Sequence, residues 1–327
     1  MTTPVIEPAG RPEESGAGGL VGVQGVVGGP GVPDLPGAPE IRLRLEVAYD
    51  GADFCGWARQ PGLRSVQAEL ESALRAVLRI EADIPVRVAV AGRTDAGVHA
   101  VGQVCHSDVP AAAWAASLGR RTPGASPDPS LAVRRRLNGL LPPDLRVRQV
   151  GVAPAGFDAR WSASWRRYSY LVADDPAGQD PRTRGHVLWH PRALDVEAMD
   201  AAAAPFVGEH DFAAYCRARE GASSVRTLHD IGWRRVGRSA GASSPVEFSV
   251  RADAFCHSMV RSLVGAFIAV GDGRWPLERP AELLAAAERV PVIETAPAHP
   301  LTLVEVGYPP ESDLAAQAER ARRWRGR

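Results

Sequence analysis

The residues of this chain best suited to chemistry are Arg93 and Asp95, in the stretch 91–100. Gly92 and Gly97 within it allow sharp bends and a close approach of another chain or ligand. In an extended segment, residues two positions apart share a face, so the Arg93 guanidinium could keep the Asp95 carboxylate ionised and aimed. A carboxylate held in this way can act as a nucleophile. Residue types alone favour a plainer interpretation, in which Asp95 begins a turn and Arg93 is its surface ion pair.

The elements that must position this stretch can be predicted from apolar spacing. Alternation over 41–47 and 86–90 predicts strands, and Ser65 is a good N-cap for a helix over 66–78. After the stretch, the patterns predict a strand over 101–106, a helix over 131–141 and a strand over 145–152. The order in this part of the chain is therefore β-α-β-β-α-β.

The second part of the chain repeats that order. The predicted elements are a strand over 168–172, a helix over 194–207, strands over 225–236 and 246–252, helices over 259–268 and 281–289, and a strand over 301–306. Two such units predict an α+β fold of two tandem ferredoxin-like halves, with a central cleft between them.

The expected organisation has two domains within a longer chain of 327 residues. An N-terminal domain over 40–152 carries Asp95, and a C-terminal domain covers 153–312. Three segments fall outside this core: a disordered, Gly- and Pro-rich extension over 1–39, a surface insertion over 110–130 and a charged tail over 313–327. The tail carries several arginines, for which a solvated face is the plainer interpretation and RNA contact the alternative.

Composition limits the possible partners and compartments. The formal net charge is zero, which argues against a uniformly basic surface but leaves room for a local basic groove. No apolar run approaches the length of about 20 residues that spans a membrane. None of the four cysteines forms a C-x-x-C pair, and no secretory signal precedes them, so a reduced, cytosolic setting is expected. Cys105–His106 and Cys256–His257 lack zinc-site spacing, so no metal is expected there.

Seven blocks, in order along about 41–308, resemble the tRNA pseudouridine synthase A family. The central one is GRTDAGVHAVGQV at 92–104, which looks like the signature of that family. The others are YDGADFCGW at 49–57, SVQ at 65–67, FDARWSA at 157–163 with RRYSY at 166–170, GEHDF at 208–212, MVRSLVG at 259–265 and TAPAHPL at 295–301. One such block would be a weak signal, whereas seven in order are very specific.

The resemblance implies isomerisation of uridine to pseudouridine in the anticodon stem-loop of tRNA, at positions 38, 39 and 40. It also implies a cytoplasmic homodimer that uses neither a metal nor an organic cofactor. The nucleophile would be Asp95, which attacks C6 of the base or C1′ of the sugar. The glycosidic bond then breaks, the uracil turns, C5 joins the sugar and a proton leaves C5. The target base must first leave its stack, at a cost of a few kcal/mol.

The resemblance also assigns roles around Asp95. Arg93 matches the arginine that pairs with the aspartate, and Arg261 matches the basic residue of the second-domain helix. Tyr168 matches the tyrosine that stacks on the base and is a candidate for proton transfer, although a core strand aromatic would look the same. Leu301 matches the apolar residue that packs on the flipped base.

Two further arginines, Arg135 and Arg136 on the predicted helix 131–141, are expected to contact tRNA phosphates. Three positions depart from the family pattern. Asp158 stands where the family usually has His, Pro300 where it has Gly, and Ala58 where it has Gln. These departures concern tRNA contacts and the Leu301 loop, and they leave the nucleophile in place.

Two other functions are alternatives to an active synthase. A non-catalytic tRNA-binding or tRNA-folding protein on the same scaffold would predict loss of Asp95, which is present. A hydrolase with an aspartate nucleophile would need a second acid or base to activate water, and the stretch offers only His99. That histidine is expected to be structural, through hydrogen bonds near the loop.

Overall fold

The structure is a computed structural model that describes residues 39–118, 130–217, 223–237, 244–288 and 291–325. All but the last residue of the expected extension, and most of the insertion after residue 118, lie outside the described residues. Residues 38–327 form one compact unit. Residues 40–152 are the N-terminal half of this unit and residues 153–312 the C-terminal half.

The N-terminal half forms the predicted β-α-β-β-α-β series, with one helix added. Ser65 caps the first helix through a bond from the Ala68 amide to its hydroxyl, as the sequence predicts. The elements are β1 Glu40–Tyr49, α1 Val66–Leu78, β2 Val88–Val90, β3 His99–Pro110, α2 Ala111–Leu118, α3 Ser130–Leu140 and β4 Leu145–Val152.

In the described residues, the C-terminal half repeats the series and adds two short strands, one helix and two 3₁₀ turns. Its elements are β5 Trp165–Ala173, β6 Leu188–Trp189, α4 Val196–Ala203, η1 Ala204–Phe206, β7 Gly208–Asp211, η2 Ala213–Tyr215, β8 Val225–Arg235, β9 Val246–Ala252, α5 Met259–Gly271, α6 Arg279–Ala286 and β10 Leu301–Gly307. After it, η3 Glu311–Asp313 leads into the tail helix α7 Leu314–Arg325. None of the helices in the described ranges is long and apolar enough to cross a membrane.

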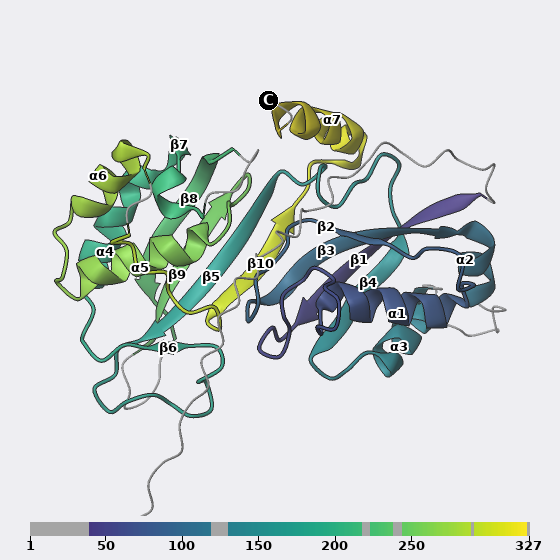
Figure 1. The fold of residues 1–327 in the computed structure, drawn as a ribbon, viewed down its shortest axis with the longest axis horizontal. Helices are drawn as coiled ribbons and strands as arrows, with labels where there is room; N and C mark the ends of the chain where they lie inside the picture. Colours follow the sequence, from purple (N-terminus) through teal and green to yellow (C-terminus); the bar gives the residue numbers. More distant parts are fainter. Residues whose placement is uncertain (1–38, 119–129, 218–222, 238–243, 289–290, 326–327) are drawn as a thin grey trace, which may run out of the picture. The chain divides into compact units, whose positions relative to one another are not determined.

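Both halves contribute to one continuous sheet, in the order β4-β1-β3-β10-β5-β9-β8-β7 (Figure 1). In the N-terminal half, β2 also pairs with β3, so its strands lie in the order β4-β1-β3-β2. The C-terminal half repeats this with β10-β5-β9-β8. Both orders are those of a ferredoxin-like unit, which confirms the predicted α+β fold.

The two halves meet where β10 runs parallel to β3. The pairing is short, with Thr302 opposite His99 and Leu303 opposite Ala100. The strands approach closely because Gly102 has no side chain: an added Cβ there would lie 2.1 Å from the carbonyl oxygen of Val304. This junction directly follows the Asp95 region, so the last strand of the sheet lies beside the candidate site.

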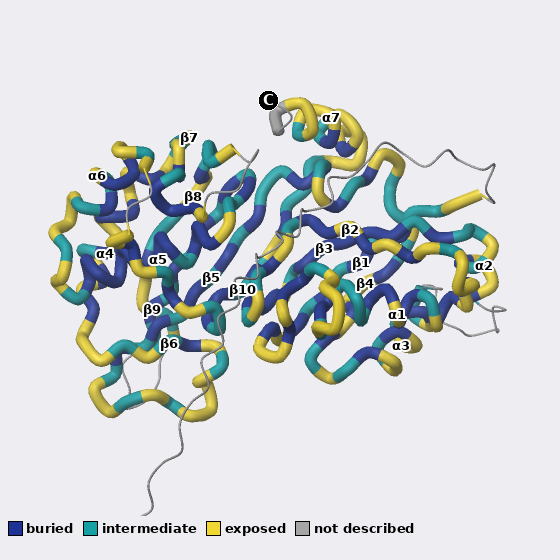
Figure 2. The backbone as a smooth tube through the Cα atoms, viewed as in Figure 1, coloured by how far each residue is buried: buried dark blue, intermediate teal, exposed yellow. Residues whose placement is uncertain are grey.

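The core follows the sheet through both halves, as the dark blue parts of the tube show (Figure 2). Helix α5 is buried at every position except Arg261. A helix that is apolar on all sides belongs in a protein interior. Arg261 is the single charged residue on this helix, and we therefore infer that it serves the chemistry of the protein or a specific contact.

The start of the segment 110–130, which the sequence predicts to be a surface insertion, is instead a helix. Residues 111–118 form helix α2, whose Trp114 side chain is only 6% exposed. The helix packs against β1, β3, α1 and α3. Its sequence, AAAWAASL, has almost no amphipathic pattern, so apolar spacing gave no signal for it.

The tail is a helix, and one side of it is buried. Leu314 and Ala318 of α7 are both 3% exposed. Ser162 donates a hydrogen bond to the Leu314 carbonyl, and Arg322 pairs with Asp158 at 3.1 Å. The charged end of the chain thus packs on the segment just before β5.

Candidate active site

The loop that carries Asp95, residues 91–98 and hereafter the Asp95 loop, connects β2 to β3. It ends in a tight turn, in which the Val98 amide donates to the Asp95 carbonyl at 3.2 Å. Gly97 in that turn has φ +79°, the left-handed conformation that glycine adopts without strain. The turn interpretation of these residues is therefore right about the local backbone.

The turn changes the expected relation between Arg93 and Asp95. Because the loop is bent and not extended, residues two positions apart do not share a face. Arg93 is exposed, and the described residues include no ion pair between it and Asp95. Among the described residues, the basic side chain paired with the Asp95 carboxylate is instead His257, whose Nε2 lies 3.7 Å from Asp95 Oδ1. The role of Arg93 stays a prediction.

A buried polar network supports the loop from beneath. Gln103 on β3 donates to the Gly92 carbonyl at 2.8 Å and to the Tyr49 hydroxyl at 3.2 Å. The Tyr49 hydroxyl also lies 2.8 Å from Thr94 Oγ1, and its pKa is raised to about 12 by burial. Because this phenol stays protonated, it can donate to Thr94 while accepting from Gln103. The residue before Asp95 is thereby fixed.

The segment after β1 holds the loop from another side. The Trp57 amide donates to the Thr94 carbonyl at 3.0 Å. Gly51 approaches so closely that an added Cβ would lie 2.0 Å from the Val98 carbonyl oxygen. Gly56, at φ +91°, also requires the freedom of glycine. The block at 49–57 is therefore a cradle for the Asp95 loop.

Arg166 ties the Asp95 loop to the C-terminal half. It lies at the start of β5 and is 4% exposed. Its guanidinium donates to the carbonyls of Ala91 at 2.8 Å, Asp253 at 2.7 Å and Arg160 at 2.8 Å. The first of these begins the Asp95 loop, and the second begins the loop that carries His257. One buried side chain therefore aligns two loops from different halves.

Tyr168 lies in the interior of β5, where 8% of it is exposed. Its ring meets Phe255 edge-on, with centroids 5.1 Å apart. The pKa of the Tyr168 phenol is raised well above its usual value, first by burial and then by the neighbouring Tyr49 and the Asp95 charge. Tyr168 is therefore held as a neutral phenol that senses the Asp95 charge, and its role toward a substrate base stays a prediction. Tyr170, two residues on, is fully buried and is a core residue.

Arg261 and Leu301 both adjoin the segment 294–300. Arg261 Nε donates to the Ala296 carbonyl at 2.6 Å, and the Ala296 amide donates back to the Arg261 carbonyl at 3.1 Å. Leu301 is 5% exposed and pairs with Tyr170 across β10 and β5, while Tyr168 pairs with Leu303. Leu301 and Tyr168 are thus diagonal neighbours on one face of the sheet.

Arg135 and Arg136 lie away from this cluster. Their helix α3 packs on β4, and the order β4-β1-β3 leaves about 10 Å between β4 and β3. Arg135 is exposed. Arg136 donates to the Ser117 carbonyl and so connects α3 to α2. A phosphate contact by these residues would belong to an outer part of a large ligand.

Two of the departures from the family pattern have a visible local role. Asp158 Oδ1 accepts from the amides of Arg160 and Trp161 at 2.8 and 2.9 Å, which shapes the turn before β5. Pro300 has no amide donor, and the turn before β10 closes through the next residue, with the Leu301 amide donating to the Ala298 carbonyl at 3.0 Å. No contact in the structure explains Ala58.

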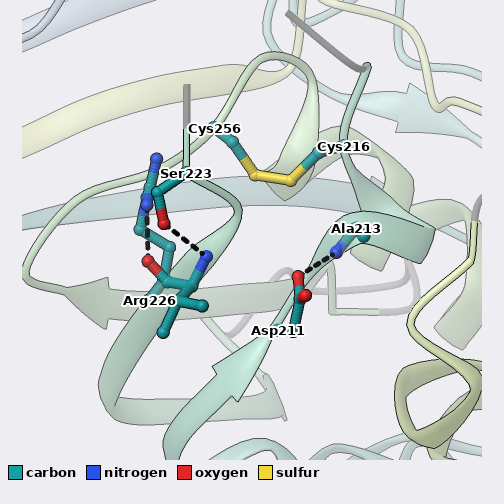
Figure 3. Close-up of a disulfide and its surroundings, with 7 residues drawn as sticks. Asp211, Ala213, Cys216, Ser223, Arg226 and Cys256 are labelled. Atoms are coloured by element: carbon teal, nitrogen blue, oxygen red, sulfur yellow. Dashed lines mark hydrogen bonds between the residues drawn. A yellow bond between two sulfur atoms is a disulfide. The ribbon is translucent and has the colours of Figure 1, made fainter. Parts of the chain in front are cut away.

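The expectation of reduced cysteines is corrected for one pair. Cys216 and Cys256 form a disulfide between the segment after η2 and the segment before α5 (Figure 3). The two cysteines are 40 residues apart in the chain, so no C-x-x-C spacing indicates their pairing. Cys55 and Cys105 are free. His257 directly follows the disulfide, and no motif in the sequence singled it out as a neighbour of Asp95.

Among the residues that the structure describes, one group of side chains could hold a metal ion. Asp50, His99 and His186 each offer a ligand atom, and these atoms lie within 4.8 Å of one another. Both ring nitrogens of His99 are already engaged. Nδ1 lies 2.9 Å from the Gly51 amide, and Nε2 lies 2.6 Å from the His299 carbonyl. The structural role expected for His99 is confirmed by these bonds.

Comparisons with known proteins agree on a class. A family model described as tRNA pseudouridine synthase matches residues 202–309. Such proteins are isomerases, and the paired ferredoxin-like halves around a loop carboxylate fit that class.

Close relatives define the family further. The tRNA pseudouridine synthase A of Streptomyces griseus is 52% identical over 282 residues, which is 86% of this chain and 93% of the relative. That of Frankia casuarinae is 53% identical over 85% of this chain and 93% of the relative, and that of Mycobacterium leprae is 46% identical over the same shares. The chain belongs to the tRNA pseudouridine synthase A family. One solved structure, a Cbf5-Nop10-Gar1 complex, aligns with a TM-score of 0.27 at 13% identity over 69% of this chain and 54% of that chain, a likeness too low to support an argument.

Proposed function

We propose that Asp95 is the nucleophile with which this chain isomerises uridine to pseudouridine in tRNA. The observation that carries the proposal is the setting of this carboxylate. Its side chain is 38% exposed and therefore open to a substrate, while Thr94 beside it is 6% exposed and fixed by hydrogen bonds. A rigid backbone with one accessible carboxylate is what a positioned nucleophile requires.

The surrounding residues suit the binding of a flipped base. Tyr168 and Leu301, on one face of the sheet, would pack on the uracil ring and offset the few kcal/mol that unstacking costs. Arg261 would supply positive charge from α5, because its Nε is bound to a carbonyl and its charge has no carboxylate partner within 4 Å among the described residues. Arg93, which is exposed, would approach Asp95 or a tRNA phosphate when the substrate binds.

The substrate would be the anticodon arm of tRNA, with positions 38, 39 and 40 as targets. Arg135 and Arg136 on α3 would contact phosphates farther along the arm. We also propose that the chain acts in the cytoplasm as a homodimer and that its reaction uses neither a metal nor an organic cofactor. The family relationship supports these points, and a measured solution mass of two chains would test the dimer.

The decisive experiment uses an unmodified tRNA transcript with tritium at C5 of uridine. The wild-type protein is expected to release tritium, whereas Asp95→Ala is expected to bind the tRNA and release none. Glu305→Ala is a matched control, because it also removes an acidic side chain but from a half-exposed ion pair with Arg167 on the sheet. Normal turnover by Asp95→Ala would refute the nucleophile. No release by either protein, with tRNA still bound, would favour an RNA-binding protein on the same scaffold.

A further inference from the structure

The proposed reaction leaves one proton without an assigned acceptor. When C5 of the uracil has joined the sugar, C5 still carries its hydrogen, which must leave to restore the ring. Tyr168 is poorly suited to take it. Burial and the Asp95 charge raise the pKa of this phenol, so the phenolate that could act as a base is scarcely populated near neutral pH.

His257 lies where such an acceptor is needed. Its Nε2 is 3.7 Å from Asp95 Oδ1. Asp95 attacks either C6, which is bonded to C5, or C1′, which becomes bonded to C5. In both routes the atom attacked by Asp95 is one bond from the carbon that loses the proton. A group facing the Asp95 carboxylate therefore faces C5 as well.

The backbone of His257 is held from two sides. The preceding residue, Cys256, is joined to Cys216 by the disulfide (Figure 3). The Arg217 amide donates to the His257 carbonyl at 3.0 Å. Ser258, next in the chain, has φ +62° and turns the backbone into α5. The imidazole is thus presented to Asp95 by a fixed segment, while 47% of the side chain remains exposed for exchange of a proton with water.

We propose that the neutral imidazole of His257 accepts the C5 proton in the last step of the isomerisation. The C5–H bond breaks, and its electron pair forms the C5=C6 double bond of pseudouridine. At C6 the bond that breaks is the ester bond to Asp95, which leaves as a carboxylate, if Asp95 attacked C6; if Asp95 attacked C1′, the C6=N1 double bond opens and its electron pair stays on N1. The C5 proton passes to the imidazole and from the imidazolium to water, and water supplies the proton that N1 carries in the product. The step needs no oxidant, reductant or further reactant. It rests on the proposed function of Asp95.

Histidine suits this step because its ordinary pKa, about 6.5, lies near the working pH. The opposite role is a permanent imidazolium that pairs with Asp95. The two roles predict opposite pH dependence. A base must be neutral, so turnover would fall toward acidic pH. An ion-pair partner must be charged, so turnover would fall as the pH rises. Other titratable or charged side chains on the segments that meet here are Asp253, Tyr168, Arg261, Arg93, Arg166 and Arg217.

The test compares wild type with His257→Asn and His257→Ala in single-turnover reactions, using tRNA transcripts that carry hydrogen or deuterium at C5 of uridine. His210→Asn is the matched control, because His210 is a partly exposed histidine on the edge strand β7. Loss of a general base lowers rates by about 10²–10⁴-fold. We expect a loss in that range for both His257 variants, with unchanged tRNA affinity and melting temperature, and a normal rate for the control.

Two readouts separate proton transfer from a structural role. The C5 deuterium isotope effect should increase in His257→Asn, because removal of the C5 proton becomes rate-limiting. Added imidazole should restore turnover to His257→Ala. A His257→Asn protein within threefold of wild type, or one with no change in isotope effect, would overturn the proposal. A wild-type protein that makes no pseudouridine would instead refute the function on which it rests.

Discussion

Replacing Arg166 with Met should separate the buried support of the site from ordinary surface charge. The three short hydrogen bonds of this guanidinium reach main-chain carbonyls, and the side chain is 4% exposed. Each buried acceptor that loses its donor costs about 1–3 kcal/mol, and removal of one partner from a buried charged contact costs about 3–5 kcal/mol. We therefore expect Arg166→Met to lower the free energy of unfolding by about 3–5 kcal/mol.

The next residue supplies the control. Arg167 has a side chain that is 38% exposed and pairs with Glu305, which is 50% exposed. Exposed pairs of this kind contribute about 0–1 kcal/mol, so Arg167→Met should change stability by less than 1 kcal/mol. Both variants keep an unbranched, flexible side chain, shorten it by the same amount and remove one positive charge. Urea unfolding, followed by tryptophan fluorescence and by circular dichroism, measures the difference.

Activity should respond in the same direction. Because Arg166 holds the starts of the loops that carry Asp95 and His257, its loss should reduce kcat more than it weakens tRNA binding. Arg166→Lys should be intermediate, since an ammonium keeps the charge but cannot match the planar geometry that reaches several carbonyls. If Arg166→Met and Arg167→Met destabilise the protein equally, the assignment of Arg166 as the link between the halves is wrong.

Three further predictions concern other parts of the chain. Hydrogen bonds from Arg235 lower the pKa of the Asp174 carboxyl below 3.8. The ionised carboxylate therefore stabilises the fold above that pH, and this contribution is lost as the pH falls through the lowered pKa. Acid unfolding below about pH 4 should be less steep in Asp174→Asn than in wild type. Gly51→Ala should destabilise the fold by about 1–3 kcal/mol or more, because the added methyl group would clash with the Val98 carbonyl oxygen. A melting temperature equal to that of wild type would contradict this close approach. Neutralising Arg135 and Arg136 together should reduce the slope of log affinity for tRNA against log salt by about 1–2, and an unchanged slope would remove them from the interface.

The sequence predicted the regular elements well because their signals are local. Alternation in β1 and the Ser65 cap of α1 depend on neighbours within a few residues, and the structure reproduces both. The ferredoxin-like order followed from counting those elements. Helix α2 was not predicted because its alanine-rich sequence shows little alternation of apolar and polar residues. Strand β7 was not predicted because four residues are too few to show a hydrophobic period.

The candidate site was predictable only in part because its geometry depends on contacts between distant segments. Asp95 could be named from its motif. The bend that separates Asp95 from Arg93 depends on the segment 49–57, which follows β1. The approach of His257 to Asp95 depends on β9, α5 and a disulfide between cysteines 40 residues apart in the chain. Contacts that bring several distant segments together produce no hydrophobic period within any single segment, so the sequence of one segment does not reveal them.

The parallel pairing of β10 with β3 also affects the synthesis of the protein. A nascent chain leaves the ribosome from its N-terminus, so β3 and the Asp95 loop emerge about 200 residues before β10, as the pairing of His99 with Thr302 shows. Throughout that interval the edge of β3 beyond β2 has no partner. Loop closure over such a span is slow compared with local folding. The synthase therefore completes its site as one of its last folding events, and a chain that stops before residue 301 would contain Asp95 without the strand beside it.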